Sequence, residues 1–351
     1  MGESSAAKNL LGRILRSGWS VLKIIEKEEF QTGAYFSVCY EVEKNGEKGF
    51  LKAFDFVPFK RMAEAGKTTM DIMGDMINAY NYEKELSQIC KNGHVTQVAF
   101  VKDFGEEYIE GFSDPIVPYL IFELADGDVR KLLHYSNKLD MTWKFKSLHS
   151  IAKGINQLHK LEISHQDIKP SNILIFDGNT MIGDLGRALC KFLNIPHKNE
   201  VFAGDNRYAP PEILYRYYES EWRRRLFSTD CYLLGSLVVF YFSGISMTAM
   251  LKKYIPENMQ WHNWRGEYND VIGYVLDAFS QSLDEIENCV EGEYFKSELR
   301  NIIEQLCYPI PSKRGHSKLV GIKGNQYDLE RFITKLDVLM NKARYEFVGN
   351  K

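Results

Sequence analysis

The segment from Ile163 to Ala188, ISHQDIKPSNILIFDGNTMIGDLGRA, constrains the fold more than any other part of this 351-residue chain. Two short apolar runs, ILIF and TMI, flank the sequence DGN, a strong turn signal, so the pattern predicts an antiparallel β-hairpin. Asn172 precedes the first strand and Asp184 follows the second. Both residues are therefore expected at the open end of the hairpin, with Asp167 nearby on the loop that leads into it.

The side chains expected at that end suit phosphoryl transfer. Two carboxylates and an amide oxygen favour a hard divalent cation such as Mg²⁺, which prefers oxygen ligands. Lys169 adds a fixed positive charge. Phosphoryl transfer needs cations on the phosphate oxygens and a base at the attacking hydroxyl. Each residue alone is ordinary in a turn, but the ordered set is hard to obtain by chance: His165, Asp167, Lys169, Asn172, Asp184 and Gly186.

The segment resembles the catalytic loop and metal-binding loop of protein kinases, and the resemblance continues in order over about residues 19 to 318. GDNRYAPPE resembles the family's A-P-E segment and ends at Glu212, for which Arg314 in PSKRG is the expected buried partner. FSTDCYLLGSLVVFYFSG resembles the central buried helix, in which Asp230 would brace the catalytic loop. The resemblance implies an α+β, bilobal protein kinase-like fold, with a small antiparallel β-sheet plus helix in the N-lobe and a mainly helical C-lobe.

The order of strand-like and helix-like segments agrees with two lobes. Three β-like runs lie within about residues 18 to 55, VAFVKDFG and YLIFEL resemble two more strands, and helical periodicity extends from about Phe59 to Cys90. The stretch between Lys52 and Glu83 is long enough for an extra helix. We expect a short helical N-terminal extension (1–17), an N-lobe (18–124), a C-lobe (125–318) and a C-terminal helical tail packed on the large lobe (319–351).

The resemblance also implies a nucleotide site. Lys52 of GFLKAF would grip the α- and β-phosphates, with Glu83 as its helix partner in preference to Glu85, which would face away. YLIFELADGD would form the last strand and the hinge against adenine, and Asp128 is expected to cap the next helix rather than touch the ribose. The implied nucleotide-binding residues are Gly33, Val38, Phe50, Lys52, Glu123, Ala125, Leu174 and Asp184.

Several positions depart from the family's pattern. The phosphate-covering loop keeps only its middle glycine, Gly33, so close approach of its backbone amides to phosphate should be stiffer. Phe50 stands where the family has a small Ala over the adenine ring, and the phenyl group would stack on the base or partly fill the pocket. We favour an altered fit over occlusion. Leu185 replaces the usual Phe after the metal-binding Asp184, and both are apolar packing residues.

The activation loop departs as well. Gln166 replaces an Arg that commonly pairs with a phosphorylated activation-loop residue, and no Ser, Thr or Tyr occurs from Leu185 to Arg207. We therefore expect a kinase that is not switched on by phosphorylation of this loop. Asp205 occupies the place of a family Thr near the catalytic base. A salt link from Asp205 to Lys169 and a loose surface carboxylate are both open at this point.

Composition limits the partners and the compartment. A formal net charge of −3 gives no overall reason to bind nucleic acid or an anionic membrane. Six cysteines without a C-x-x-C pair exclude the usual zinc spacings and favour a reducing compartment. The N-terminus lacks the apolar run of a secretory signal, and the longest apolar run, residues 232–242, is too short to span a bilayer, so a cytoplasmic protein is expected. Added helices between Asp230 and Arg314 would either dock a protein partner or pad the fold.

Together the resemblance implies an ATP-dependent Ser/Thr protein kinase that uses Mg²⁺, or Mn²⁺. Lys52 and Glu83 would orient ATP, Asn172 and Asp184 would hold the metal, Asp167 would accept or orient the substrate hydroxyl, and Lys169 would neutralise charge on the transferred phosphoryl group. Lys169, two residues after Asp167, is typical of Ser/Thr rather than Tyr kinases. The alternatives are a pseudokinase scaffold and a small-molecule phosphotransferase of the aminoglycoside or choline type.

Overall fold

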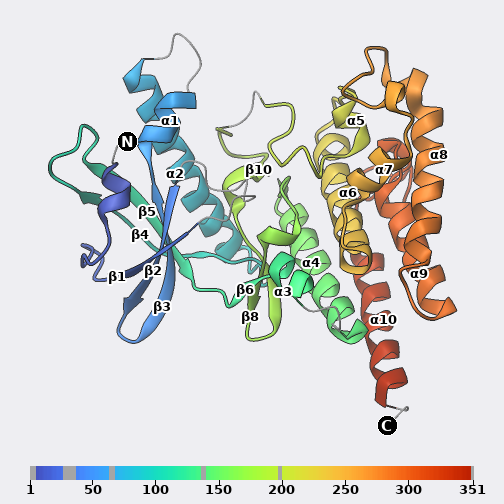
Figure 1. The fold of residues 1–351 in the computed structure, drawn as a ribbon, viewed down its shortest axis with the longest axis horizontal. Coiled ribbons are helices and arrows are strands. Elements are labelled where there is room, and N and C mark those ends of the chain that lie inside the picture. The colour runs from blue at the N-terminus through green and yellow to red at the C-terminus, as the bar shows by residue number, and fades with distance from the viewer. Residues whose placement is uncertain (1–4, 27–36, 63–67, 136–139, 197–199, 349–351) are drawn as a thin grey trace.

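The computed structural model describes residues 5–26, 37–62, 68–135, 140–196 and 200–348. Strands gather in the N-terminal part, at the left of Figure 1, and helices make up most of the C-terminal part at the right. This division confirms the bilobal α+β fold expected from the sequence. The candidate site brings together residues of both parts.

The N-terminal part is built on one antiparallel sheet with the strand order β1-β2-β3-β5-β4. Its strands are β1 (Ser20–Ile25), β2 (Ser37–Lys44), β3 (Glu47–Phe54), β4 (Val101–Tyr108) and β5 (Ile116–Glu123). The β2–β3 connection is tight because Asn45 and Gly46 both have positive φ, 55° and 81°, as two-residue hairpin turns of this kind require.

The two faces of this sheet bury different clusters. Leu51 on β3 packs with Tyr40 and Ile121 under the N-terminal segment. Leu120 on β5 belongs instead to a cluster with Met76 on the opposite face. Since successive side chains of a strand point to opposite faces, Lys52 lies on the same side as Leu120, facing the helix that carries Met76.

Two helices follow β3: α1 (Phe56–Met62) and α2 (Thr69–Asn92). Thr68 starts α2 with a reciprocal capping box, in which its hydroxyl accepts from Asp71 N–H and the Asp71 carboxylate accepts from Thr68 N–H. The periodicity from Phe59 to Cys90 is thus divided between two helices, and α1 is the expected extra one. The strand expected over VAFVKDFG starts later, because residues 97–99 pair with Ile182 of the hairpin instead of with β5.

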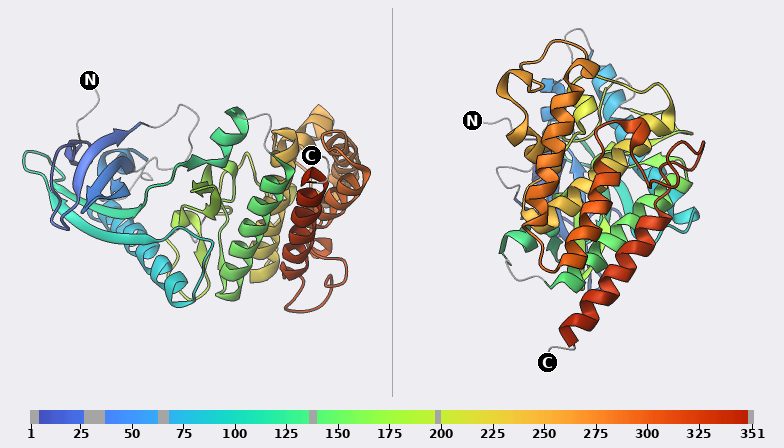
Figure 2. Two further views of the ribbon diagram at one scale, coloured as in Figure 1. Left: turned by 90° about the horizontal axis from the view of Figure 1, so that it is seen from below. Right: turned by 90° about the vertical axis from the view of Figure 1, so that its right-hand side faces the viewer.

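The C-terminal part consists of helices around a buried central one. They are α3 (Val129–Tyr135), α4 (Met141–Lys160), α5 (Pro211–Leu214), α6 (Trp222–Ser243), α7 (Met247–Tyr254), α8 (Tyr268–Glu287), α9 (Glu293–Cys307) and α10 (Glu330–Val348). The last helix, α10, runs alongside α4 and buries Phe332, Leu336 and Leu339 against the core (Figure 2). The tail helix therefore packs on the large lobe.

The central helix α6 is apolar over most of its length. Among the described residues it is the one helix long and apolar enough to cross a membrane, whereas the longest apolar run in the sequence is too short to do so. The difference arises because the helix continues on both sides of the apolar run at residues 232–242. In the structure 83% of its most apolar window is buried among neighbouring helices, as in the core helix of a folded domain.

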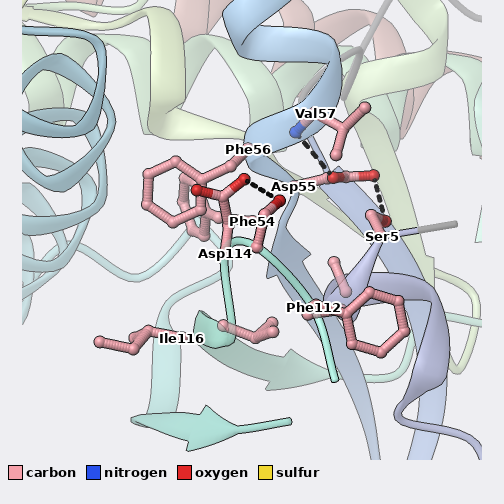
Figure 3. A pocket seen from close by; sticks show the side chains of 12 residues that line it. Ser5, Phe54, Asp55, Phe56, Val57, Phe112, Asp114 and Ile116 are labelled. Atoms are coloured by element: carbon pink, nitrogen blue, oxygen red, sulfur yellow. Dashed lines mark hydrogen bonds between the residues drawn. The ribbon is translucent and has the colours of Figure 1, made fainter. Parts of the chain in front are cut away.

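The N-terminal segment is fastened to the end of β3. Ser5 Oγ donates to Asp55 Oδ2 at 2.9 Å, and Asp55 Oδ1 accepts from Val57 N–H at 3.1 Å (Figure 3). The cavity beside them has a volume of about 20 Å³, enough for roughly one water molecule and too small for an organic ligand. Only a 3-10 turn, Ala6–Asn9, is helical in the described part before β1, less than the expected helical extension.

Candidate active site

The predicted hairpin is present and organises the site. Strands β8 (Ile173–Phe176) and β9 (Asn179–Ile182) pair antiparallel, and β6 (Gly127–Asp128) adds a third strand beside β8. Asp177 and Gly178 have φ of 47° and 71° at the turn. At the open end Gly183 N–H donates to Asn172 C=O at 2.7 Å. This bond brings Asp184, the next residue, beside Asn172, as the sequence predicts.

The loop before the hairpin is held by one buried carboxylate, that of Asp230 on α6. Asp230 on α6 is fully buried and accepts from His165 N–H at 2.8 Å, Gln166 N–H at 2.9 Å and Ser164 Oγ at 2.8 Å, and it pairs with His159 Nε2 at 2.9 Å. Burial alone would raise the pKa of Asp230, but the bonds from His159 and the loop lower it below the usual value. The predicted bracing role of Asp230 agrees with this geometry.

Gln166 is turned into the interior by the same arrangement. Its φ of 64° is unusual for a residue with a side chain, and its amide donates to Ser164 Oγ at 2.7 Å and to Leu226 C=O at 3.2 Å. The side chain is therefore engaged with the base of α6 and does not extend toward the activation loop. Ser164 accepts a hydrogen bond from Gln166 and donates one to Asp230, so it helps to position the loop. It was not predicted from the sequence.

Asp167, Lys169 and Asn172 form a buried group. Lys169 Nζ lies 2.8 Å from Asp167 Oδ2, and Asn172 Nδ2 donates to the same oxygen at 2.9 Å. Burial raises the pKa of Asp167 above the usual carboxyl value, against the opposing effect of Lys169. A carboxylate with a raised pKa, held by directed hydrogen bonds, is suited to accept a proton from a hydroxyl.

Lys52 joins the sheet to the hairpin. Its ammonium group lies 2.8 Å from Glu83 Oε2 on α2 and 3.2 Å from Asp184 Oδ1. Burial disfavours the ammonium, but the two carboxylates outweigh it and raise the pKa of Lys52. The same lysine holds the pKa of Asp184 at about 2. Gly186 leaves room for this cluster, because a Cβ at that position would lie a tight 3.2 to 3.4 Å from all three charged groups.

The choice of Glu83 over Glu85 matches the helix geometry. Glu83 is buried and meets Lys52, whereas Glu85 is exposed. Tyr82, which the sequence reading did not single out, ties the same helix to the segment after the metal-binding loop. Its hydroxyl donates to Ala188 C=O at 3.0 Å and accepts from Cys190 N–H at 2.9 Å. The α2 helix is thus fixed both through Glu83 and through Tyr82.

The other expected nucleotide-binding residues lie on β2, β3, the end of β5 and the hairpin. Phe50 is half-buried opposite Phe122, with ring centroids 6.4 Å apart. Asp128 accepts from Lys131 N–H at 3.0 Å, so it caps α3, as we expected. Gly33 lies outside the described residues. Contacts with a nucleotide remain predictions for six residues: Gly33, Val38, Phe50, Glu123, Ala125 and Leu174.

The activation segment, which runs from Asp184 to Glu212, is anchored at two points. Glu212 on α5 forms a bidentate salt bridge with Arg314, whose Nη1 and Nη2 donate to the two carboxylate oxygens at 2.8 and 2.9 Å. Arg314 is completely buried. Nearer the catalytic loop, Asp205 N–H donates to Asp167 Oδ1 at 3.1 Å and Asp205 Oδ2 lies 3.8 Å from Lys169 Nζ. The Asp205 side chain is 8% exposed. Of the two alternatives, the structure therefore has the link to Lys169 and not the loose surface carboxylate.

The donor set at the hairpin mouth fits a hard divalent cation. Asn172 uses its amide nitrogen to bind Asp167, so the amide oxygen is left to face another direction, and the strongly acidic Asp184 stays ionised beside it. Within the described residues no group of three or more His, Cys, Asp or Glu side chains could hold a metal by itself. Two protein oxygens with water and phosphate in the remaining positions are what Mg²⁺ commonly accepts.

Comparison with known families matches residues 81–320 to the protein kinase domain. This range covers more than half of the chain and contains the hairpin, the catalytic loop and both anchors of the activation segment. The chain belongs to the protein kinase family. Proteins of this family use ATP and a divalent metal ion and act on protein substrates.

Individual relatives are similar over shorter stretches. A probable serine/threonine-protein kinase of Streptomyces coelicolor is 29% identical over 195 residues, which are 54% of this chain and 28% of that protein. A Wee1-like protein kinase of Arabidopsis thaliana is 34% identical over 131 residues, 37% of this chain and 24% of that protein. The serine/threonine-protein kinase atg1 of Dictyostelium discoideum is 32% identical over 145 residues, 39% and 20% respectively. The chain spans less than a third of the length of each of these relatives.

Proposed function

We propose that this chain is an ATP-dependent protein kinase that transfers the γ-phosphoryl group to Ser or Thr hydroxyls of proteins. The observation that carries the proposal is the position of Lys52, which reaches from the sheet to contact Glu83 at 2.8 Å and Asp184 at 3.2 Å. The Lys52 ammonium therefore lies beside the residues of the hairpin mouth, which supports a role for it in gripping phosphates. The names of the relatives above support the choice of Ser and Thr.

Each residue then has a role in transfer. Lys52, held by Glu83, binds the α- and β-phosphates, and Lys169 neutralises charge on the transferred group. The Asp167 carboxylate orients the substrate hydroxyl and takes up its proton. Asn172 and Asp184 would hold Mg²⁺, or Mn²⁺, which when bound neutralises phosphate charge.

The surrounding residues give the nucleotide its place. Adenine would lie near the hinge from Glu123 to Ala125, between Val38 and Phe50 on one side and Leu174 on the other, and Gly33 would cover the phosphates. The N-terminal extension (1–17), the N-lobe (18–124), the C-lobe (125–318) and the tail (319–351) would form a single unit around this cleft. A protein partner would dock on the helices between Asp230 and Arg314, and we place the protein in the cytoplasm.

Phosphorylation of the activation loop is not part of the proposed control. Gln166 is buried against Ser164 and Leu226, and the loop from Leu185 to Arg207 carries no hydroxyl side chain. Mapping phosphosites on active protein tests this point. An activating phosphosite in the continuation of this segment up to Glu212, where Tyr208 is the one hydroxyl residue, would contradict it.

The test of the activity is a transfer assay on the purified full chain. It uses labelled ATP, Mg²⁺ or Mn²⁺ in separate reactions, and casein as a generic protein substrate. Asp167→Asn should lower the rate at least about 100-fold, because it removes the proton acceptor and keeps its shape. Asp140→Asn is the matched control, since Asp140 is an exposed cap of α4 and Asn caps equally well.

The outcomes separate the alternatives. Label on protein Ser or Thr that is lost in Asp167→Asn supports the kinase. Label only on an added aminoglycoside or choline supports the small-molecule phosphotransferase, although the Glu212–Arg314 anchor belongs to a platform for protein substrates. ATP binding without any transfer supports the pseudokinase, which Phe50 favours slightly.

A further inference from the structure

Asp205 belongs to the activation segment and contacts the catalytic loop. Its main-chain N–H donates to Asp167 Oδ1 at 3.1 Å, and its carboxylate lies 3.8 Å from Lys169 Nζ. The same carboxylate binds Arg207 on the other side, at 2.7 Å from Nη2. One residue thus contacts the proton acceptor through its backbone and the phosphoryl-binding lysine through its side chain.

The charges around Asp205 alternate and compensate one another. Lys169 lies between the carboxylates of Asp167 and Asp205, and Arg207 closes the row at the exposed end. Removing one member of a buried charged group leaves its partner uncompensated, which is strongly unfavourable. Without the Asp205 carboxylate, the attraction of Lys169 to Asp167 would lose its counterbalance, and Lys169 would compete more strongly with the substrate hydroxyl for the Asp167 carboxylate.

A glycine lets Asp205 approach this closely. A Cβ on Gly204 would lie 2.1 Å from the carbonyl oxygen of Gln166, so the segment lies directly against the catalytic loop. A side chain at position 204 would push Asp205 away from both Asp167 and Lys169. The close contact and the carboxylate therefore act together.

We propose that Asp205 is a positioning residue for phosphoryl transfer: its permanent negative charge pairs with Lys169 and its main-chain N–H holds Asp167, so that together they dock the activation segment onto the catalytic loop. The inference deepens and rests on the proposed kinase function. It gives the segment an anchoring charge encoded in the sequence, in place of a phosphate added to the loop. The side chain acts through Lys169 and Asp167 and does not itself meet the reacting groups.

The experiment compares Asp205→Asn, which keeps the shape and loses the charge, with Asp205→Glu, which keeps the charge and changes the length. Asp205→Asn should lower kcat about 100-fold, the scale of a small misplacement of catalytic groups, while KM for ATP changes little. Asp205→Glu should retain at least about ten times more activity than Asp205→Asn, since its carboxylate still pairs with Lys169 and Arg207. Asp140→Asn serves again as control.

The relative kcat values of Asp205→Asn and Asp205→Glu distinguish positioning by charge from a merely structural role. If shape alone mattered, the isosteric Asp205→Asn would be the milder change, and a kcat equal to or above that of Asp205→Glu would overturn the proposal. A matched fall in unfolding stability that accounts for the lost activity would also overturn it. If the unsubstituted chain transfers phosphate and Asp205→Asn does so equally well, only this inference fails. If the unsubstituted chain transfers none, both proposals fail.

Discussion

The two sides of the candidate site are held in different ways. On the catalytic-loop side, defined by Asp167, Lys169 and Asn172, the side chains are buried and bonded to one another, and Asp230 supports the loop beneath them. The nucleotide side is defined by Lys52, Glu83 and Phe50. It is joined to the hairpin through the Lys52 ammonium, which pairs with Glu83 on α2 and with Asp184.

This difference shows where the chain tolerates change. Several donors converge on Asp230, so the catalytic loop is positioned by many bonds that fail together if their acceptor is removed. The nucleotide side depends on the ion pairs of Lys52 with Glu83 and Asp184, on the Tyr82 hydrogen bonds that hold α2, and on the shape of a half-buried aromatic face. Phe50 is a departure from the family's pattern on the nucleotide side, whereas Asp167, Lys169 and Asn172 on the catalytic-loop side all match it.

The largest effect, on the free energy of unfolding, should follow from Asp230→Ala, which removes the buried acceptor that supports the catalytic loop. The substitution leaves the N–H groups of His165 and Gln166, and the side chains of Ser164 and His159, without their buried acceptor. Since each unsatisfied buried group costs about 1–3 kcal/mol, the free energy of unfolding should fall by more than about 3 kcal/mol. Urea unfolding followed by circular dichroism measures it.

Asp270→Ala is the control for that experiment. Asp270 is exposed and accepts one main-chain hydrogen bond at the start of α8, a cap worth about 1 kcal/mol. Equal losses for Asp230→Ala and Asp270→Ala would show that the catalytic loop does not depend on one acceptor.

A smaller effect should follow from Glu83→Gln on the nucleotide side. Lys52 keeps Asp184 but loses the negative charge of its partner on α2, so phosphate binding becomes less well oriented. We expect kcat/KM for ATP to fall about 100-fold. Unfolding stability should change little, because burying a carboxylate is itself costly, as the raised pKa of Glu83 shows. Steady-state kinetics with varied ATP provide the measurement.

Glu85→Gln is its matched control. The two residues lie two positions apart on α2, but Glu85 faces solvent and should give unchanged kinetics. Similar losses in both variants would mean that the charge of α2 as a whole matters, and not the pair with Lys52.

Much of the site could be predicted because its signals are local. The turn sequence DGN fixed the hairpin register, and the register alone brings Asn172 and Asp184 to one end. The two-residue spacing of Glu83 and Glu85 was enough to choose the buried one. These predictions needed no knowledge of distant contacts.

Other features depend on contacts between distant segments. Residues 97–99 have a strand-like composition but pair with Ile182, so β4 begins at Val101. Tyr82 looks like any helix residue until the segment at Ala188 and Cys190 meets it. The fate of Asp205 was undecidable from the sequence, since a carboxylate in a loop pairs or stays free according to which groups fold beside it.

The smallest effect should come from Phe50→Ala, which tests whether the aromatic face of the nucleotide side helps or hinders binding. Phe50 follows Gly49 on β3, opposite Phe122, and points to the same face as Lys52, two residues on. If its ring stacks on the adenine, the loss of the contact is worth about 1 kcal/mol, and KM for ATP should rise about 3- to 10-fold. The kcat should stay close to its original value, because the residues around Asp167 are untouched.

Phe104→Ala is the control, since Phe104 is half-exposed on the edge strand β4. It removes the same ring from the same sheet and should leave KM for ATP unchanged. A fall in KM for Phe50→Ala would reverse the interpretation, because the ring would then occupy space that the nucleotide needs. In that case the nucleotide side would be obstructed as well as weakly held, and the contrast with the catalytic-loop side would be greater than the ion pair alone suggests.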